Sequence, residues 1–173
     1  MPVKDSRKKT TIKTFFNKKA GGEKISMLTA YDYFIAHLLD QAGIDAILVG
    51  DSAANVIHGY KSTLPITMDI MVAHTAAVAR GTEYALVIAD MPFLSFQPSI
   101  ETAVLNAGRF LKEGNAAAVK IEGGLEMLET IKRVIQCGIP VMGHLGMTPQ
   151  SINQFGGPKV QGKEQRSKSY LIE

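Results

Sequence analysis

Short apolar runs and longer amphipathic stretches alternate along most of this chain. The apolar runs predict strands at 25–30, 46–49, 85–89, 117–121 and 140–143. They are mostly apolar throughout, as is typical of parallel strands covered on both faces. Between them, the spacing of apolar positions predicts helices at 33–41, 69–80, 99–113 and 125–136. This repeated order of strand and helix predicts an α/β fold.

A glycine follows each predicted helix. These are Gly43, Gly81, Gly114 and Gly138, and each stands where a left-handed residue often ends a helix. The glycines therefore support the predicted helix ends.

Strand–helix repeats of this kind either close into a barrel or form an open, doubly wound sheet. An open dinucleotide-binding sheet carries a glycine-rich loop after its first strand, whereas residues 27–32 contain no glycine. The pattern therefore favours a TIM-type barrel. We expect that barrel to be incomplete, because about five strand–helix units are present and a closed barrel needs about 250 residues.

Composition and charge divide the 173 residues into two parts. Residues 1–24 are rich in lysine and predict a basic tail with a short helix, and residues 25–173 predict the partial barrel domain. No nucleic-acid-binding module follows the basic segment, so we expect no nucleic-acid partner. No apolar run reaches the length of a membrane span and no signal peptide is recognisable, which predicts a cytoplasmic protein without a membrane partner.

Three carboxylates stand at or just beyond the ends of predicted strands. Asp51, Asp90 and Glu122 each follow an apolar run, at the edge of the sheet where barrels place their active sites. Carboxylate oxygens are ligands that Mg²⁺ prefers, so the three together predict a magnesium site. Each alone could equally be the N-cap of the next helix, although that explanation is weaker for three successive units.

Six segments in order resemble the ketopantoate hydroxymethyltransferase family, over residues 11–163. The segments are Met-Leu-Thr-Ala-Tyr-Asp (27–32), Ile-Leu-Val-Gly-Asp-Ser (47–52), Ser-Thr-Leu-Pro-Ile-Thr (62–67), Ala-Asp-Met-Pro-Phe (89–93), Val-Lys-Ile-Glu-Gly-Gly (119–124) and Gly-His-Leu-Gly-Met-Thr-Pro-Gln-Ser (143–151). The resemblance implies a magnesium-dependent (β/α)8 barrel of the phosphoenolpyruvate/pyruvate superfamily. It also implies transfer of a hydroxymethyl group from 5,10-methylenetetrahydrofolate to 3-methyl-2-oxobutanoate, giving 2-dehydropantoate for pantothenate and coenzyme A synthesis. A homo-oligomer is expected for the full-length form.

By the same resemblance, the metal carboxylates fall on Asp51, Asp90 and Glu122. Asp51, Ser52, Asp90 and Lys120 correspond to positions that bind the substrate. Lys120 and Glu122 are two residues apart on one predicted strand and therefore share a face. The alternative for Lys120 is a surface lysine that extends its amine into solvent. His144 either contacts a substrate or is an ordinary histidine at the rim.

The family's general base is a glutamate in a Leu-Glu-x-Val-Pro context, and no such segment occurs before Glu173. We therefore expect no catalytic base within this chain. This leaves two alternatives to the transferase: an inactive remnant of that enzyme, or a related lyase acting on another 2-oxo acid. We also expect two exposed strand edges, and hence self-association.

Overall fold

The computed structural model describes residues 7–173, so the first six residues of the predicted basic tail lie outside the described residues. The strands are β1 (Met27–Thr29), β2 (Ala46–Val49), β3 (Leu86–Asp90), β4 (Ala118–Glu122) and β5 (Val141–His144). The α-helices are α1 (Ile12–Ala20), α2 (Tyr33–Gln41), α3 (Ala53–Val56), α4 (Met68–Gly81), α5 (Ile100–Lys112), α6 (Leu128–Gln136), α7 (Ile152–Phe155) and α8 (Gln165–Ile172). Two 3-10 turns, η1 (Leu125–Met127) and η2 (Pro149–Ser151), precede α6 and α7. All five predicted strands and four predicted helices are present, with bounds shifted by no more than a few residues.

The five strands form one sheet in the order β1-β2-β3-β4-β5, and every neighbouring pair is parallel. Each new strand is added on the same side of the previous one. An open dinucleotide-binding sheet instead reverses this direction at its middle, where its ligand binds. The uniform order confirms the predicted barrel class, here as a curved sheet of five strands.

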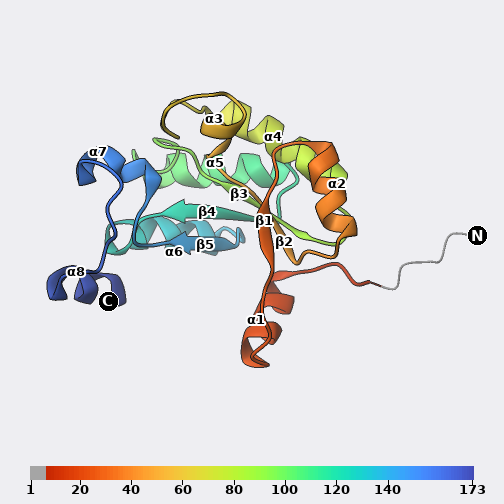
Figure 1. The fold of residues 1–173 in the computed structure, drawn as a ribbon, viewed down its shortest axis with the longest axis horizontal. Helices are drawn as coiled ribbons and strands as arrows, with labels where there is room; N and C mark the ends of the chain where they lie inside the picture. Colours follow the sequence, from red (N-terminus) through yellow and green to blue (C-terminus); the bar gives the residue numbers. More distant parts are fainter. Residues whose placement is uncertain (1–6) are drawn as a thin grey trace, which may run out of the picture.

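The main hydrophobic core lies between the outer face of the sheet and the helices that follow the strands. Alternate strand residues such as Ile47, Val87 and Val119 point to this side and are buried. Helices α2 and α4 pack against each other, as do α5 and α6. In Figure 1, α2 and α4 lie above the strands, whereas α1 projects below them. The outer helices thus cover one face of the sheet.

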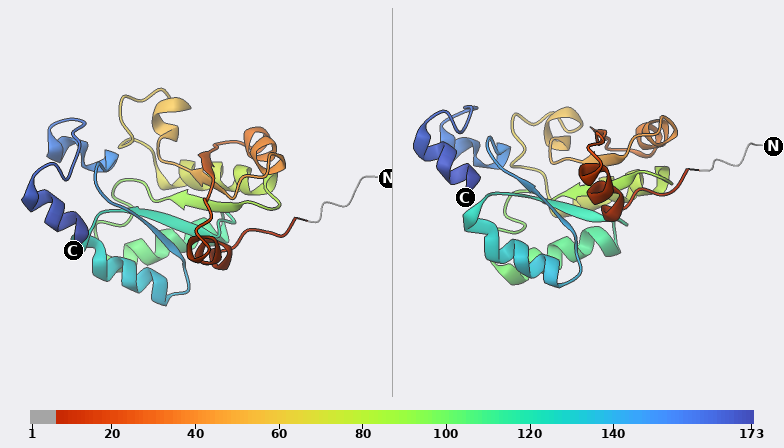
Figure 2. Two further views of the ribbon diagram at one scale, coloured as in Figure 1. Left: turned by 60° about the horizontal axis from the view of Figure 1, so that its bottom comes forward. Right: turned by 90° about the horizontal axis from the view of Figure 1, so that it is seen from below.

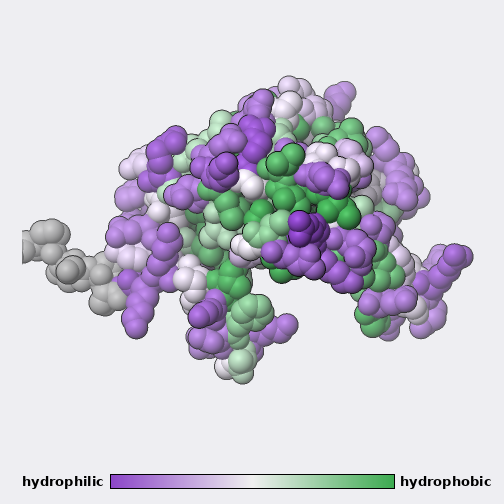
Figure 3. Space-filling model, turned by 180° about the vertical axis from the view of Figure 1, so that it is seen from behind, coloured by the Kyte–Doolittle hydropathy of each residue, from purple (hydrophilic) through white to green (hydrophobic). Residues whose placement is uncertain are grey.

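The inner, concave face of the sheet is open. Figure 2 shows α1 in front of the strands when the molecule is seen from below, with the outer helices around them. Strands β1 and β5 form the two edges, and all three residues of β1 are exposed. Figure 3, seen from behind, shows hydrophobic patches among hydrophilic surface and a hollow between the two lower projections of the molecule. The expected exposed strand edges are therefore present.

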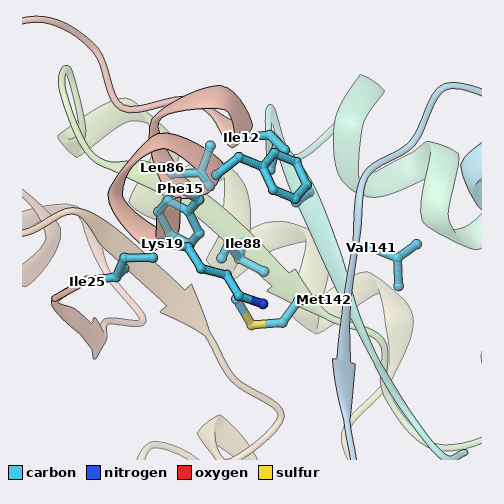
Figure 4. A pocket seen from close by; sticks show the side chains of 10 residues that line it. Ile12, Phe15, Lys19, Ile25, Leu86, Ile88, Val141 and Met142 are labelled. Carbon is cyan, nitrogen blue, oxygen red and sulfur yellow. The ribbon is translucent and has the colours of Figure 1, made fainter. Parts of the chain in front are cut away.

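Helix α1 packs across the beginning of the strands on the inner face. Its first turn is capped by Thr11, whose hydroxyl accepts a hydrogen bond from the Thr14 amide. Ile12 and Phe15 contact a small second core that includes Leu86, Ile88 and Ala118. An apolar pocket of about 230 Å³ remains between α1 and these strands (Figure 4). The amphipathic character of α1 is thus explained by one face that packs on the sheet.

Two of the predicted helix-ending glycines have another role. Gly43 and Gly138 have positive φ, as predicted, but Gly81 and Gly114 do not. A Cβ at Gly81 would lie 2.4 Å from the carbonyl oxygen of Tyr33, so the absence of a side chain lets α4 approach α2. The prediction of a left-handed conformation is wrong for Gly81 and Gly114.

Within residues 7–173, no helix is long and apolar enough to cross a membrane.

Candidate active site

The predicted site residues come together at the carboxyl ends of neighbouring strands. Asp90 ends β3 and pairs in register with Lys120 of β4, and Glu122 ends β4 and pairs with His144 of β5. Register partners in a parallel sheet point to the same face, and residues two apart on a strand do as well. All four side chains therefore project from the inner face. Asp51 follows β2, and its backbone N–H donates a hydrogen bond of 3.2 Å to Asp90 Oδ2.

Lys120 is the cation at the centre of this group. Its Nζ lies 2.8 Å from Asp90 Oδ1, 3.7 Å from Glu122 Oε1 and 3.3 Å from His144 Nδ1. Asp51, Asp90 and Glu122 are only 3%, 2% and 5% exposed, and Lys120 is 8% exposed. The alternative of a lysine that extends into solvent is therefore wrong. His144 Nδ1 lies 3.2 Å from Glu122 Oε1, so this histidine contacts the site from its rim.

Burial disfavours the ionised form of the site carboxyl groups. It raises the pKa of Asp90 to about 7, even though the Lys120 ammonium lowers that pKa, and the Asp51 charge raises it further. Burial also raises the pKa of Glu122, against the lowering effects of the Gln150 backbone N–H and of Lys120. Asp90 and Glu122 therefore share one buried lysine, with the buried Asp51 carboxylate beside them. The site has excess negative charge, which a bound cation would stabilise.

The carboxylates have the chemistry of a magnesium site. Asp90 Oδ1 and Glu122 Oε1 are buried and accept no hydrogen bond of good geometry, although both lie near the Lys120 ammonium. Mg²⁺ is commonly held by one or two carboxylates, with water and substrate oxygens as its remaining ligands. Among residues 7–173, no group of three Asp, Glu, His or Cys side chains is arranged so that all three could hold one metal ion, and this includes the three predicted carboxylates. These residues thus fit an ion held by few protein ligands.

The helix-capping alternative for the three acids is wrong. The N-cap residues after β2, β3 and β4 are Ser52 for α3, Ser99 for α5 and Gly124 for η1. The Ser99 hydroxyl accepts the bond from the first turn of α5. The carboxylates are therefore not required to start the next helices.

Ser52 uses its hydroxyl in a contact that the sequence did not indicate. Its Oγ lies 2.8 Å from the hydroxyl of Tyr31, and it makes no capping bond to α3. The carbonyl oxygen of Tyr31 lies 2.7 Å from His74 Nδ1, and His74 in turn contacts His58 across 2.9 Å between their Nε2 atoms. No sequence pattern indicates a role for Tyr31, His74 or His58.

Gln150 is a second site residue that sequence reasoning missed. Its side-chain amide donates a hydrogen bond to Asp51 and its backbone N–H donates one to Glu122. It lies in the turn η2 after β5, where no hydrophobic period identifies a site residue. The only signal was its place in the Thr-Pro-Gln-Ser part of a recognised segment.

A pocket of about 370 Å³ opens beside this group of polar residues. Glu122, Gln150 and Gln97 line it together with apolar side chains that include Leu64 and Phe93. The apolar pocket under α1 lies at the other end of the strands and is lined by few polar atoms. Of these two pockets, only the one beside Glu122 is lined by residues of the candidate site, namely Glu122 and Gln150.

Known proteins resemble this chain in sequence over nearly its whole length. The sequence profile described as ketopantoate hydroxymethyltransferase matches residues 9–173. A 3-methyl-2-oxobutanoate hydroxymethyltransferase of Clostridium botulinum strain 657 is 57% identical over 165 residues, covering 95% of this chain and 60% of that protein. The protein of the same name from Syntrophus aciditrophicus is 54% identical, covering 100% of this chain and 64% of the relative. The chain thus spans about 60% of the length of such relatives.

Solved structures show the same fold at low sequence identity. A trigonal crystal form of 2,3-dimethylmalate lyase, described as a PEP mutase/isocitrate lyase superfamily member, aligns with a TM-score of 0.63 at 19% identity. The alignment covers 95% of this chain and 57% of the lyase. Phosphonopyruvate hydrolase aligns with a TM-score of 0.62 at 14% identity, covering 80% of this chain and 51% of the hydrolase.

Proposed function

This chain belongs to the ketopantoate hydroxymethyltransferase family, and we propose that its site binds 3-methyl-2-oxobutanoate together with Mg²⁺. The reaction proposed for the whole protein moves a hydroxymethyl group from 5,10-methylenetetrahydrofolate to this 2-oxo acid, giving 2-dehydropantoate. The product serves pantothenate and coenzyme A synthesis. We further propose a cytoplasmic protein that forms a homo-oligomer in its full-length form.

One observation supports this function above the others. Asp51, Asp90 and Glu122 are buried at the ends of three successive strands, and the Lys120 ammonium lies 2.8 Å from an oxygen of Asp90 and 3.7 Å from an oxygen of Glu122. A 2-oxo acid offers a carboxylate and a keto oxygen on adjacent carbons, which suit a site that holds a cation and one lysine. When bound, Mg²⁺ polarises the keto group of such an acid.

The chain's own residues contribute fixed charges and donors. Lys120 places a positive charge beside Asp90, where negative charge would develop on the substrate as its C3 proton is lost. The Ser52 hydroxyl can donate to a substrate carboxylate oxygen, with the Tyr31 hydroxyl 2.8 Å away to orient it. Burial of the acids excludes water, which strengthens each of these interactions.

Binding is tested first, because it requires only the residues of this chain. Calorimetry with Mg²⁺ and 3-methyl-2-oxobutanoate should give saturable binding that chelation of the metal abolishes. Asp90→Ala should weaken the binding of both ligands, since we propose that the acid is held largely through the cation. Glu83→Ala is the matched control, because its carboxylate is exposed and lies outside the site. Unchanged affinity in Asp90→Ala would refute the assignment of this acid.

Turnover separates the transferase from its alternatives. The assay follows formation of 2-dehydropantoate from 3-methyl-2-oxobutanoate and 5,10-methylenetetrahydrofolate by the 173-residue chain. Product formation would exclude an inactive remnant. Binding without turnover is expected if the family's general base is required, because no counterpart of that glutamate occurs in these residues. Rapid cleavage of another 2-oxo acid without folate would instead establish a lyase.

A further inference from the structure

Gln150 connects two of the three site carboxylates from a turn that belongs to neither of their strands. Its Nε2 donates to Asp51 Oδ2 at 3.0 Å, and its backbone N–H donates to Glu122 Oε2 at 3.0 Å. The same Nε2 donates its second proton to the carbonyl oxygen of Met91, the residue after Asp90, at 2.8 Å. One residue therefore bonds to the ends of three strand segments.

The orientation of the Gln150 amide is fixed by a second glutamine. Gln97 Nε2 donates to Gln150 Oε1 at 3.0 Å, and Gln97 Oε1 faces the Phe96 backbone N–H at 3.5 Å. A primary amide has two donor positions and one acceptor oxygen, and all three of these groups in Gln150 are engaged. Gln150 is 6% exposed, so a flipped amide would bury its oxygen against Asp51 Oδ2. The hydrogen bond from Gln97 thus keeps Gln150 Nε2 directed at the Asp51 carboxylate.

These hydrogen bonds fix the orientation of the Asp51 and Glu122 carboxylates without neutralising their charge. Each of Asp51 and Glu122 has one oxygen held by a neutral donor, which restricts rotation of the carboxylate and fixes the direction of its other oxygen. In Glu122 that other oxygen, Oε1, accepts no hydrogen bond of good geometry and faces Lys120 Nζ at 3.7 Å and His144 Nδ1 at 3.2 Å. A second lysine in place of Gln150 would offset the negative charge, whereas an amide leaves it in place for a cation.

We propose that Gln150 is a positioning residue, which orients Asp51 and Glu122 for a divalent cation and is itself held in place by Gln97. This inference rests on the proposed function, because it concerns the metal of that site. Groups that hold metal ligands in orientation commonly contribute a factor of about 10 to 100 in metal affinity.

The test measures Mg²⁺ affinity of the 173-residue chain by calorimetry, without substrate. Gln150→Met keeps the length and approximate volume of the side chain and removes the side-chain donors to Asp51 and Met91, while the backbone N–H that bonds Glu122 stays in place. Because Asp51 then loses its restraint, we expect affinity to fall by about 10- to 100-fold. Gln97→Met leaves both Gln150 donors in place and should cause a smaller loss. Gln136→Met is the matched control: it makes the same change at an exposed glutamine that ends α6, outside the site, and should leave affinity unchanged.

Thermal unfolding of the metal-free variants distinguishes a positioning role from a purely structural one. If Gln150 were purely structural, its substitution would lower the unfolding temperature and leave the Mg²⁺ affinity of the folded protein unchanged. That result would overturn the inference. If Gln150→Met fails to fold, the Mg²⁺ affinity of Gln97→Met is the deciding measurement. An unchanged Mg²⁺ affinity in Gln97→Met would also overturn the inference. Normal Mg²⁺ binding by both glutamine variants leaves the proposed function intact. Absence of Mg²⁺ binding by the unsubstituted chain would overturn the metal assignment and the inference together.

Discussion

Asp90 is expected to destabilise the metal-free chain at neutral pH, so replacing it should stabilise the fold while removing a site carboxylate. Asp90→Asn is nearly isosteric. Its side-chain oxygen can still accept the hydrogen bond from the Asp51 backbone N–H. Lys120 keeps a second carboxylate, Glu122, at 3.7 Å. The substitution therefore removes chiefly the buried charge.

The magnitude follows from the pKa of Asp90, which is about 7 in the folded chain against an ordinary value of 3.8. Since its pKa is raised by folding, the folded state binds the proton more tightly than the unfolded state does. The free energy of unfolding is then unaffected by Asp90 below about pH 4 and falls as the pH rises to 7. A pKa difference of about 3 corresponds to a loss of about 4 kcal/mol, because a tenfold change in proton affinity equals about 1.4 kcal/mol.

The assay is urea unfolding of both proteins in the presence of a chelator, at intervals between pH 4 and pH 8. Near pH 4 the two proteins should have similar free energies of unfolding. By pH 8, Asp90→Asn should be more stable by about 4 kcal/mol. Glu83→Gln removes an exposed carboxylate and should follow the unsubstituted chain at every pH.

A difference between Asp90→Asn and the unsubstituted chain that stays constant with pH would refute this reasoning. So would a variant that becomes relatively less stable as the pH rises. Saturating Mg²⁺ offers a second check, because a ligand that binds only the folded state stabilises it. It should stabilise the unsubstituted chain and have much less effect on Asp90→Asn.

Three further predictions concern the scaffold. Asp40→Ala removes a buried carboxylate that accepts hydrogen bonds from the backbone N–H groups of residues 83–85, and should lower the free energy of unfolding by about 3 kcal/mol or more in urea titrations. A loss below about 1 kcal/mol would show that other acceptors replace it. Gly81→Ala places a Cβ 2.4 Å from the Tyr33 carbonyl oxygen and should cost about 1–3 kcal/mol by the same measurement, whereas unchanged stability would mean that α2 moves away freely. The open inner face and exposed β1 should make the chain self-associate in light scattering, and a monodisperse monomer would contradict this.

Local sequence was sufficient to identify the strands, the principal helices and the acids of the site. Strand and helix periods depend on neighbouring residues, so they can be read from the sequence alone. The uninterrupted apolar runs are typical of strands covered on both faces, whereas on the inner face only the small core under α1 is covered here. Asp90 and Glu122 end strands, and Asp51 follows one closely, so their place at one edge follows once the strands are parallel. The pairing of Lys120 with Glu122 on one face required only the two-residue repeat of a strand.

The tertiary structure alone decided which other groups meet these acids. Gln150 lies 99 residues from Asp51 and 28 from Glu122 in the chain, and it reaches both only because β5 pairs with β4 and turns back over the site. Tyr31 likewise meets Ser52 through the pairing of β1 with β2. Gly81 has a glycine's usual place at a helix end, yet its role comes from contact with another helix. Such contacts depend on loop paths and helix approach, which no local period of apolar and polar residues encodes.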